Sequence, residues 1–115
     1  MKKFIVLYHA PKAAAEKMAG STPEEMQEGM KPWMEWKEKC GEGMVDMGTP
    51  LGNARKMTKT DHGPSDSTVV GYSVLQAEDW DGVQKMVEGH PHLNWVDGCE
   101  IEVHECLPLP GSQSA

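Results

Sequence analysis

The chain has 115 residues, a length that suits one domain with a single core, so we expect residues 1–115 to form one domain. Eighteen acidic residues against eleven basic ones give a net charge of -7, which repels nucleic-acid phosphates and anionic lipid. We therefore predict neither nucleic acid nor a membrane as a partner. The three cysteines form neither an even disulfide framework nor a paired metal-binding spacing, which indicates reduced thiols and a cytoplasmic protein.

The N-terminal apolar run extends only to Leu7, which is too short for a secretion signal or a membrane span. Its contiguous apolar side chains predict a central β-strand over residues 3–9, covered on both faces. Residues 10–21, between Pro11 and Gly20, are only weakly patterned. We expect no regular element in that segment.

A helix is predicted to begin at Pro23, where Thr22 can cap the chain and Glu25 can complete a capping box. Pro32 lies inside the helical pattern and removes one backbone donor. We therefore expect a kink near residues 28–31, or two short helices. One broad face of this segment carries five large side chains: Met26, Met30, Trp33, Trp36 and Cys40.

The middle of the chain reads as strands joined by a long turn. In residues 43–58, glycines and Pro50 interrupt short apolar stretches, and this pattern predicts a bent strand or two strand fragments at a sheet edge. Residues 59–67 are a polar turn, and residues 68–77 form a clear strand. These two strands should pair as a hairpin with a long tip.

A second helix is predicted from about residue 78, with acidic side chains in its first turn and Gly89 at its end. Residues 99–106 alternate between apolar and polar side chains, which is typical of a strand with one core face. Residues 107–115 read as a C-terminal tail.

This order of elements predicts an α+β fold, a ferredoxin-like βαββαβ sandwich with both helices on one face of an antiparallel sheet. The other face would then lack a cover, although the first strand is apolar on both sides. A second copy packed sheet against sheet is the simplest remedy, so we expect a homodimer. The polar residues Glu100, Glu102 and His104 would point toward the shared interior or its rim.

His90 and His92 flank Pro91 in the segment that connects the second predicted helix to the last predicted strand. An imidazole exchanges protons near neutral pH, so the pair could be a base and its partner. The alternative is a helix end at which histidine is favoured by the dipole and proline stops the helix. A metal site would need further ligands, which Asp46, His9 or His104 could supply only if the fold brings them close. We therefore predict no metal.

Five further positions are candidates for the site. Trp33 and Trp36, beside flexible methionines, could line a pocket for a planar organic ligand or simply pack in the core. Asp46 could be a solvated edge carboxylate or a buried acid, and Tyr72 could be a core residue or a site phenol. Asn53 lies in turn-forming sequence next to these segments.

Four segments carry a resemblance to a known family: residues 45–53, 70–77, 89–93 and 101–110. In these segments the chain resembles the YCII-related group of dimeric α+β barrel proteins. The resemblance implies a homodimer with a pocket between the sheet and the helix ends, and no obligatory cofactor. A few members of that group are dehydrochlorinase-like enzymes acting on chlorinated hydroxyquinones, and others accompany sigma factors.

The chain departs from that family at its proposed acid–base pair. In the better-studied branch, a histidine on the first helix pairs with an aspartate before the proline that follows the second helix. Here the helix carries Lys31 and Pro32 in that region and no histidine, and His90 precedes Pro91. The pair cannot be carried over, and His90 is the nearest replacement by position.

These observations predict a small-molecule site in each subunit of a homodimer, built from the tryptophan face, residues 46–53 and the histidine turn. Its chemistry would be general acid–base catalysis by a lyase or isomerase, with His90, His92 and Asp46 as catalytic candidates. Trp33, Trp36, Asn53 and Tyr72 are the candidate ligand-binding residues. The alternative function is a non-catalytic ligand-binding or regulatory module.

Overall fold

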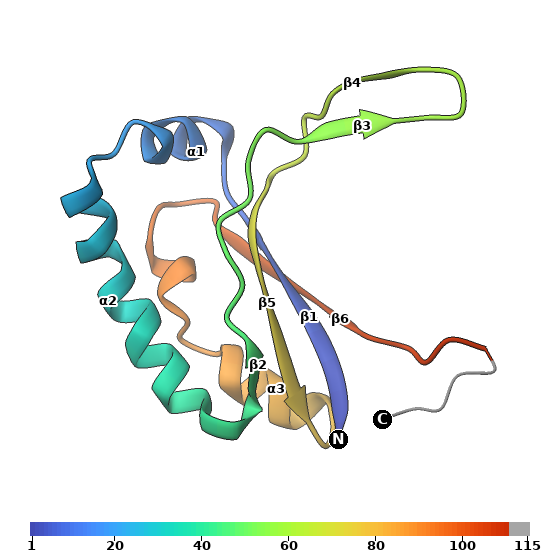
Figure 1. The fold of residues 1–115 in the computed structure, drawn as a ribbon. Helices are drawn as coiled ribbons and strands as arrows, with labels where there is room; N and C mark the ends of the chain where they lie inside the picture. The colour runs from blue at the N-terminus through green and yellow to red at the C-terminus, as the bar shows by residue number, and fades with distance from the viewer. Residues whose placement is uncertain (111–115) are drawn as a thin grey trace.

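The computed structural model describes residues 1–110, which form an α+β fold with helices on one face of a four-stranded antiparallel sheet (Figure 1). The sheet order is β2-β5-β1-β6, which confirms the first strand as a central one and is compatible with a ferredoxin-like arrangement. Residues 111–115 of the expected tail lie outside the described residues. The strands are β1 (Lys2–His9), β2 (Met44–Asp46), β5 (Val69–Ala77) and β6 (Glu100–Glu105).

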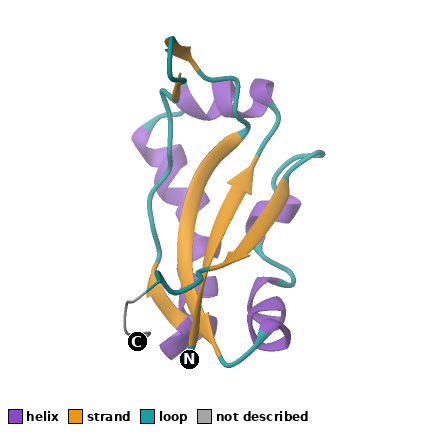
Figure 2. Ribbon diagram, turned by 90° about the vertical axis from the view of Figure 1, so that its right-hand side faces the viewer, coloured by secondary structure: helices purple, strands orange, loops and turns teal. Residues whose placement is uncertain are grey.

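The strand register assigns each side chain to one of two faces. Val6 of β1 lies opposite Ser73 of β5 and Val103 of β6, so these three share the face that packs against the helices. Leu7 lies opposite Tyr72 and Glu102, so these share the other face. Figure 2 views the sheet from this second face, which carries no helix. We call it the open face of the sheet.

Helix α2 (Pro23–Cys40) begins with the expected capping box between Thr22 and Glu25 and ends before Gly41. Helix α3 (Trp80–Val87) is capped at its N-terminus by Asp79, whose side chain accepts a hydrogen bond from the backbone of Gly82. Both helices bury apolar side chains against the sheet. The buried core comprises Phe4, Val6, Tyr8, Trp36, Cys40, Leu75, Ala77 and Val83.

The expectation of no element over residues 10–21 is wrong, because Lys12–Ala19 forms helix α1. This segment is rich in alanine, which has the highest helix propensity, and the carbonyl of Pro11 accepts hydrogen bonds from Ala14 and Ala15. The helix was not predicted because its amphipathic pattern is weak. It lies across one end of α2 (Figure 1).

Helix α2 runs continuously through Pro32, which excludes the two short helices that were one of the two alternatives expected there. Pro32 lies on the exposed side of the helix, where water can satisfy the carbonyl that it leaves unpaired. In residues 43–67, β2 pairs with β5 at the sheet edge with a register irregularity, and Pro50 adds an isolated bridge to Gly71, so the expected pairing of this segment with residues 68–77 is confirmed for residues 44–50. The segment β3 (Arg55–Met57) pairs instead with β4 (His62–Pro64), and this hairpin projects beyond the sheet (Figure 1).

Cys40, Cys99 and Cys106 are all free thiols. Among the described residues, no helix combines the length and apolar character needed to cross a lipid bilayer.

Candidate functional site

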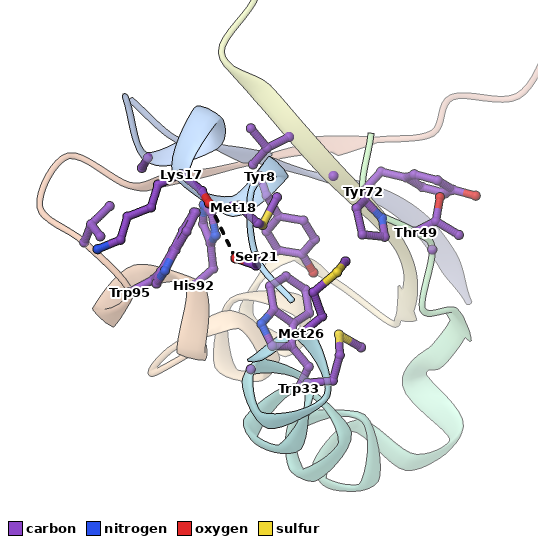
Figure 3. Close-up of a pocket in the computed structure, with 18 of the residues that line it drawn as sticks. Tyr8, Lys17, Met18, Ser21, Met26, Trp33, Thr49, Tyr72, His92 and Trp95 are labelled. Carbon is purple, nitrogen blue, oxygen red and sulfur yellow. Dashed lines mark hydrogen bonds between the residues drawn. The ribbon is translucent and has the colours of Figure 1, made fainter. Parts of the chain in front are cut away.

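A cavity of about 400 Å³ lies between the sheet and the N-terminal half of α2. One end is formed by His92 and Trp95, and the other by Thr49 and Tyr72, as Figure 3 shows. Its wall is mainly apolar and includes the ring of Trp33 and the side chains of Met18, Met26, Met30 and Met47. Cavities of this size, apolar with a few polar groups, are typical small-molecule sites.

His92 lies in the 3-10 turn η2 (Pro91–Asn94), and its side chain is only 3% exposed. Its Nε2 atom lies 2.8 Å from the backbone oxygen of His9, so Nε2 carries the proton and donates it to that carbonyl. The other ring nitrogen, Nδ1, makes no hydrogen bond to the described residues. A lone pair on a buried imidazole is therefore available beside the cavity.

Burial lowers the pKa of His92, although the hydrogen bond to the His9 carbonyl opposes this shift. The imidazole is therefore neutral at neutral pH, as a proton acceptor must be. The His9 carbonyl accepts the hydrogen bond from Nε2–H and so fixes the tautomer of His92. It would also stabilise the positive charge that forms when Nδ1 takes up a proton.

His90 is completely buried, but it lies behind the cavity wall rather than in it. Its ring packs edge-to-face against Trp36 and Trp33, with centroids 4.2 Å and 4.5 Å apart. Its Nδ1 atom accepts a hydrogen bond from the backbone of His92, and its Nε2 atom has no hydrogen-bond partner among the described residues. The edge-to-face geometry allows this N–H to point at an indole ring. Burial, followed by the nearby His92, lowers the pKa of His90 to about 3.

Tyr8 is a site residue that the sequence reasoning missed. Its ring lies 4.8 Å from that of Trp33 and 5.3 Å from that of His92, and it lines the cavity. The hydroxyl of Ser73 donates to the Met47 carbonyl at 2.6 Å, so Tyr8 must donate to Ser73, at 2.8 Å. Burial raises the pKa of Tyr8. The only available signal was a polar aromatic residue at the end of a central strand.

The two tryptophans of α2 have different roles. Trp33 lines the cavity, whereas Trp36 is 3% exposed in the core, and its Nε1–H donates to the backbone oxygen of Met86 at 2.7 Å. The structure therefore brings Trp33, but not Trp36, to the cavity.

The candidates from residues 46–53 and β5 lie at or beyond the far end of the cavity. Asp46 is exposed and outside the cavity wall, where it accepts hydrogen bonds from the Gly48 backbone at 2.9 Å and the Tyr72 hydroxyl at 3.3 Å. Tyr72 borders the cavity at the opposite end from His92, but the strand register places its side chain on the open face, and its ring points away from the cavity (Figure 3). Asn53 is exposed, has a positive φ of 54° and lies outside the wall. Asp46 is therefore not placed beside His90 and His92.

A second polar cluster lies outside the cavity, at the edge of the open face. The ring of His9 bridges Thr68 Oγ1 at 2.7 Å and Glu102 Oε1 at 3.1 Å, and His104 also approaches Glu102, at 3.4 Å. Hydrogen bonds from His9 and then His104 lower the pKa of Glu102. Within residues 1–110, no three His, Cys, Asp or Glu side chains gather closely enough to ligate a metal ion.

No protein-family model matches the chain, and no curated protein matches it. Its function must therefore be argued from the chemistry of the cavity.

Proposed function

We propose that this protein binds a small planar, mainly apolar compound in the cavity, and that His92 acts on it as a general base. One observation carries the proposal: the buried, neutral imidazole of His92 has its Nε2–H held by a carbonyl and its Nδ1 free of hydrogen bonds to the described residues. Aromatic and thioether side chains around it offer polarizable surface to a flat ligand.

The reaction that suits this base is removal of a proton from carbon next to a carbonyl group. The proton moves to Nδ1 of His92, and the electron pair of the C–H bond becomes part of an enolate. An isomerase would return the proton to a different atom, and a lyase would expel a leaving group from the neighbouring carbon. Either outcome leaves His92 neutral once the proton is released.

The alternative is a non-catalytic binding module with the same cavity. Proton-transfer chemistry commonly uses a second acid or base, yet the Tyr8 hydroxyl is committed to Ser73, and Asp46 is outside the wall. These two observations favour the module, so binding and turnover must be measured separately.

The test follows exchange of the carbon-bound protons of indanone, a flat aromatic ketone, for deuterium by NMR. The variant His92→Gln is matched, because its amide N–H can still donate to the His9 carbonyl while it lacks a basic nitrogen. We expect the wild type to bind indanone and accelerate exchange, and His92→Gln to bind it without acceleration. Binding with no acceleration by the wild type supports the module, and no binding contradicts both functions.

We also propose that two copies pair through their open faces as a dimeric α+β barrel of the YCII-related type. The half-buried side chains of Ile5, Leu7 and Val74 lie on this face, and Glu102 and His104 lie at its β6 side. Apolar residues at the centre with polar residues at the rim are typical of protein interfaces. The three free cysteines support a cytoplasmic location.

Light scattering tests the pairing. The wild type should have about twice the chain mass of 12.7 kDa. Leu7→Lys should reduce this to the mass of one chain, because it places a charge at the centre of the open face. Met34→Lys, on the exposed side of α2, is the matched control and should leave the mass unchanged. A wild type that stays monomeric contradicts the barrel.

A further inference from the structure

We propose that the ligand of the cavity carries an anionic group, such as a carboxylate or sulfonate, which binds the ammonium of Lys17. This inference rests on the proposed function, because it takes the cavity to be the ligand site. It adds the chemical class of ligand, an amphipathic anion with a flat apolar body.

The charges on the cavity wall are few and are not equivalent. Lys17 and Glu25 are its two residues with formally charged side chains at neutral pH. Oε1 of Glu25 accepts hydrogen bonds from the backbone and the hydroxyl of Thr22, at 3.4 Å and 3.1 Å, within the capping box of α2. Its charge also stabilises the N-terminal end of that helix. Glu25 therefore already has a structural role.

The ammonium of Lys17 has no hydrogen bond or ion pair with any residue of the described chain. Lys17 lies in the last turn of α1, where a cation is favoured by the helix dipole, and this is its simplest structural role. That role would be served by a lysine on any side of the helix. Here the side chain runs along Trp95 at the His92 end of the cavity (Figure 3).

The backbone around Lys17 holds this position. Its carbonyl oxygen accepts hydrogen bonds from the backbone of Gly20 at 3.2 Å and from the hydroxyl of Ser21 at 3.5 Å. These bonds fix the junction between α1 and α2, so the start of the lysine side chain is fixed relative to the wall.

The negative net charge of the protein opposes the binding of an anionic ligand, and a cation beside the cavity would offset this repulsion. A net charge of -7 repels anions from the surface in general. An anion with an apolar body would gain an apolar contact and an ion pair here, by placing its flat part in the cavity at the Trp95 end and its charge at Lys17 (Figure 3). A neutral analogue would make only the apolar contact.

Two fluorescent probes with almost the same body test this inference. Anilinonaphthalene sulfonate carries an anionic group, and phenylnaphthylamine lacks it. We expect Lys17→Gln to weaken binding of the sulfonate probe about fivefold and to leave the neutral probe unchanged. Lys17→Arg should retain the binding of both probes. Lys12→Gln removes a charge from the same helix outside this cavity and should change neither affinity.

The outcomes separate this inference from the proposed function. If the wild type binds both probes but Lys17→Gln changes neither affinity, or lowers both equally, the anion site is wrong and the cavity remains a binding site. If the wild type binds neither probe, both the inference and the proposed function are contradicted. Thermal melting of each variant verifies that it is folded.

Discussion

The backbone N–H of His92 donates a hydrogen bond to Nδ1 of His90 at 2.9 Å. This bond fixes the proton of His90 on Nε2 and holds the turn that presents His92 to the cavity. The two histidines therefore differ in role: His90 is a buried support, and His92 is the residue at the cavity wall.

We expect the free energy of unfolding to fall as the pH drops from about 7 to about 5. Burial lowers the pKa of His90 to about 3 in the folded protein and also lowers the pKa of His92. In the unfolded chain, a histidine side chain has a pKa near 6.5. Below that pH the unfolded state takes up protons that the folded state does not, so stability is lost by at most about 1.4 kcal/mol per pH unit for each histidine. Urea unfolding at several pH values measures this slope.

The variant His90→Asn tests whether His90 contributes to the pH dependence of the free energy of unfolding. Its side-chain oxygen can still accept from the His92 backbone, but it does not titrate, so the slope should decrease while the protein becomes less stable at pH 7. His62→Asn changes an exposed histidine of β4 and should leave the slope unaltered. A wild type whose stability is constant over this range would refute the buried neutral pair.

The two tryptophans of α2 should separate stability from binding. Trp36→Phe loses the hydrogen bond to Met86 and leaves a void in the core, so we expect it to lower the free energy of unfolding by about 2–3 kcal/mol. Trp33→Phe should cost about 1 kcal/mol but weaken phenylnaphthylamine binding. Urea unfolding and fluorescence titration of both variants measure this. Equal effects of the two variants on binding would show that the site is misplaced.

Gly48 has a structural requirement that its neighbour Gly52 lacks. Its φ is 77°, and an added Cβ would overlap the backbone oxygen of Tyr72. We expect Gly48→Ala to destabilise the protein by at least about 2 kcal/mol. Gly52→Ala meets no atom within 4 Å and should have almost no effect. Thermal melting of both variants measures the difference, and similar melting temperatures would contradict this packing.

The sequence predicted those elements whose signals are local and strong. The capping box of Thr22 and Glu25 marked the start of α2, and the contiguous apolar run marked β1 as central. Strict alternation in β6 identified which of its residues face the core. These signals depend on nearby residues alone, so they could be interpreted without knowing the tertiary structure.

The remaining features depend on contacts between distant segments. Helix α1 has high alanine propensity but little amphipathic pattern, and β4 contains a glycine and a proline that are typical of turns. In the site, Trp33 and Trp36 look equivalent in sequence, and contacts with distant residues such as His90 and Met86 distinguish the buried Trp36 from Trp33. Likewise, one of the two hydrogen bonds that orient the side chain of Asp46 comes from Tyr72, 26 residues away in the chain.

The measurement that tests the ligand cavity most directly is phenylnaphthylamine binding to Gly29→Leu. Gly29 lines the cavity from within α2, and an added Cβ meets no atom within 4 Å, so leucine can occupy the cavity without strain. Leucine also favours a helix over glycine by about 0.5–1 kcal/mol, so the fold should be retained. Gly52→Leu places the same side chain outside the cavity as a control. We expect fluorescence titration to show affinity at least about tenfold weaker for Gly29→Leu, with no loss for the control. Binding by Gly29→Leu that equals the wild type would contradict the cavity as the ligand site.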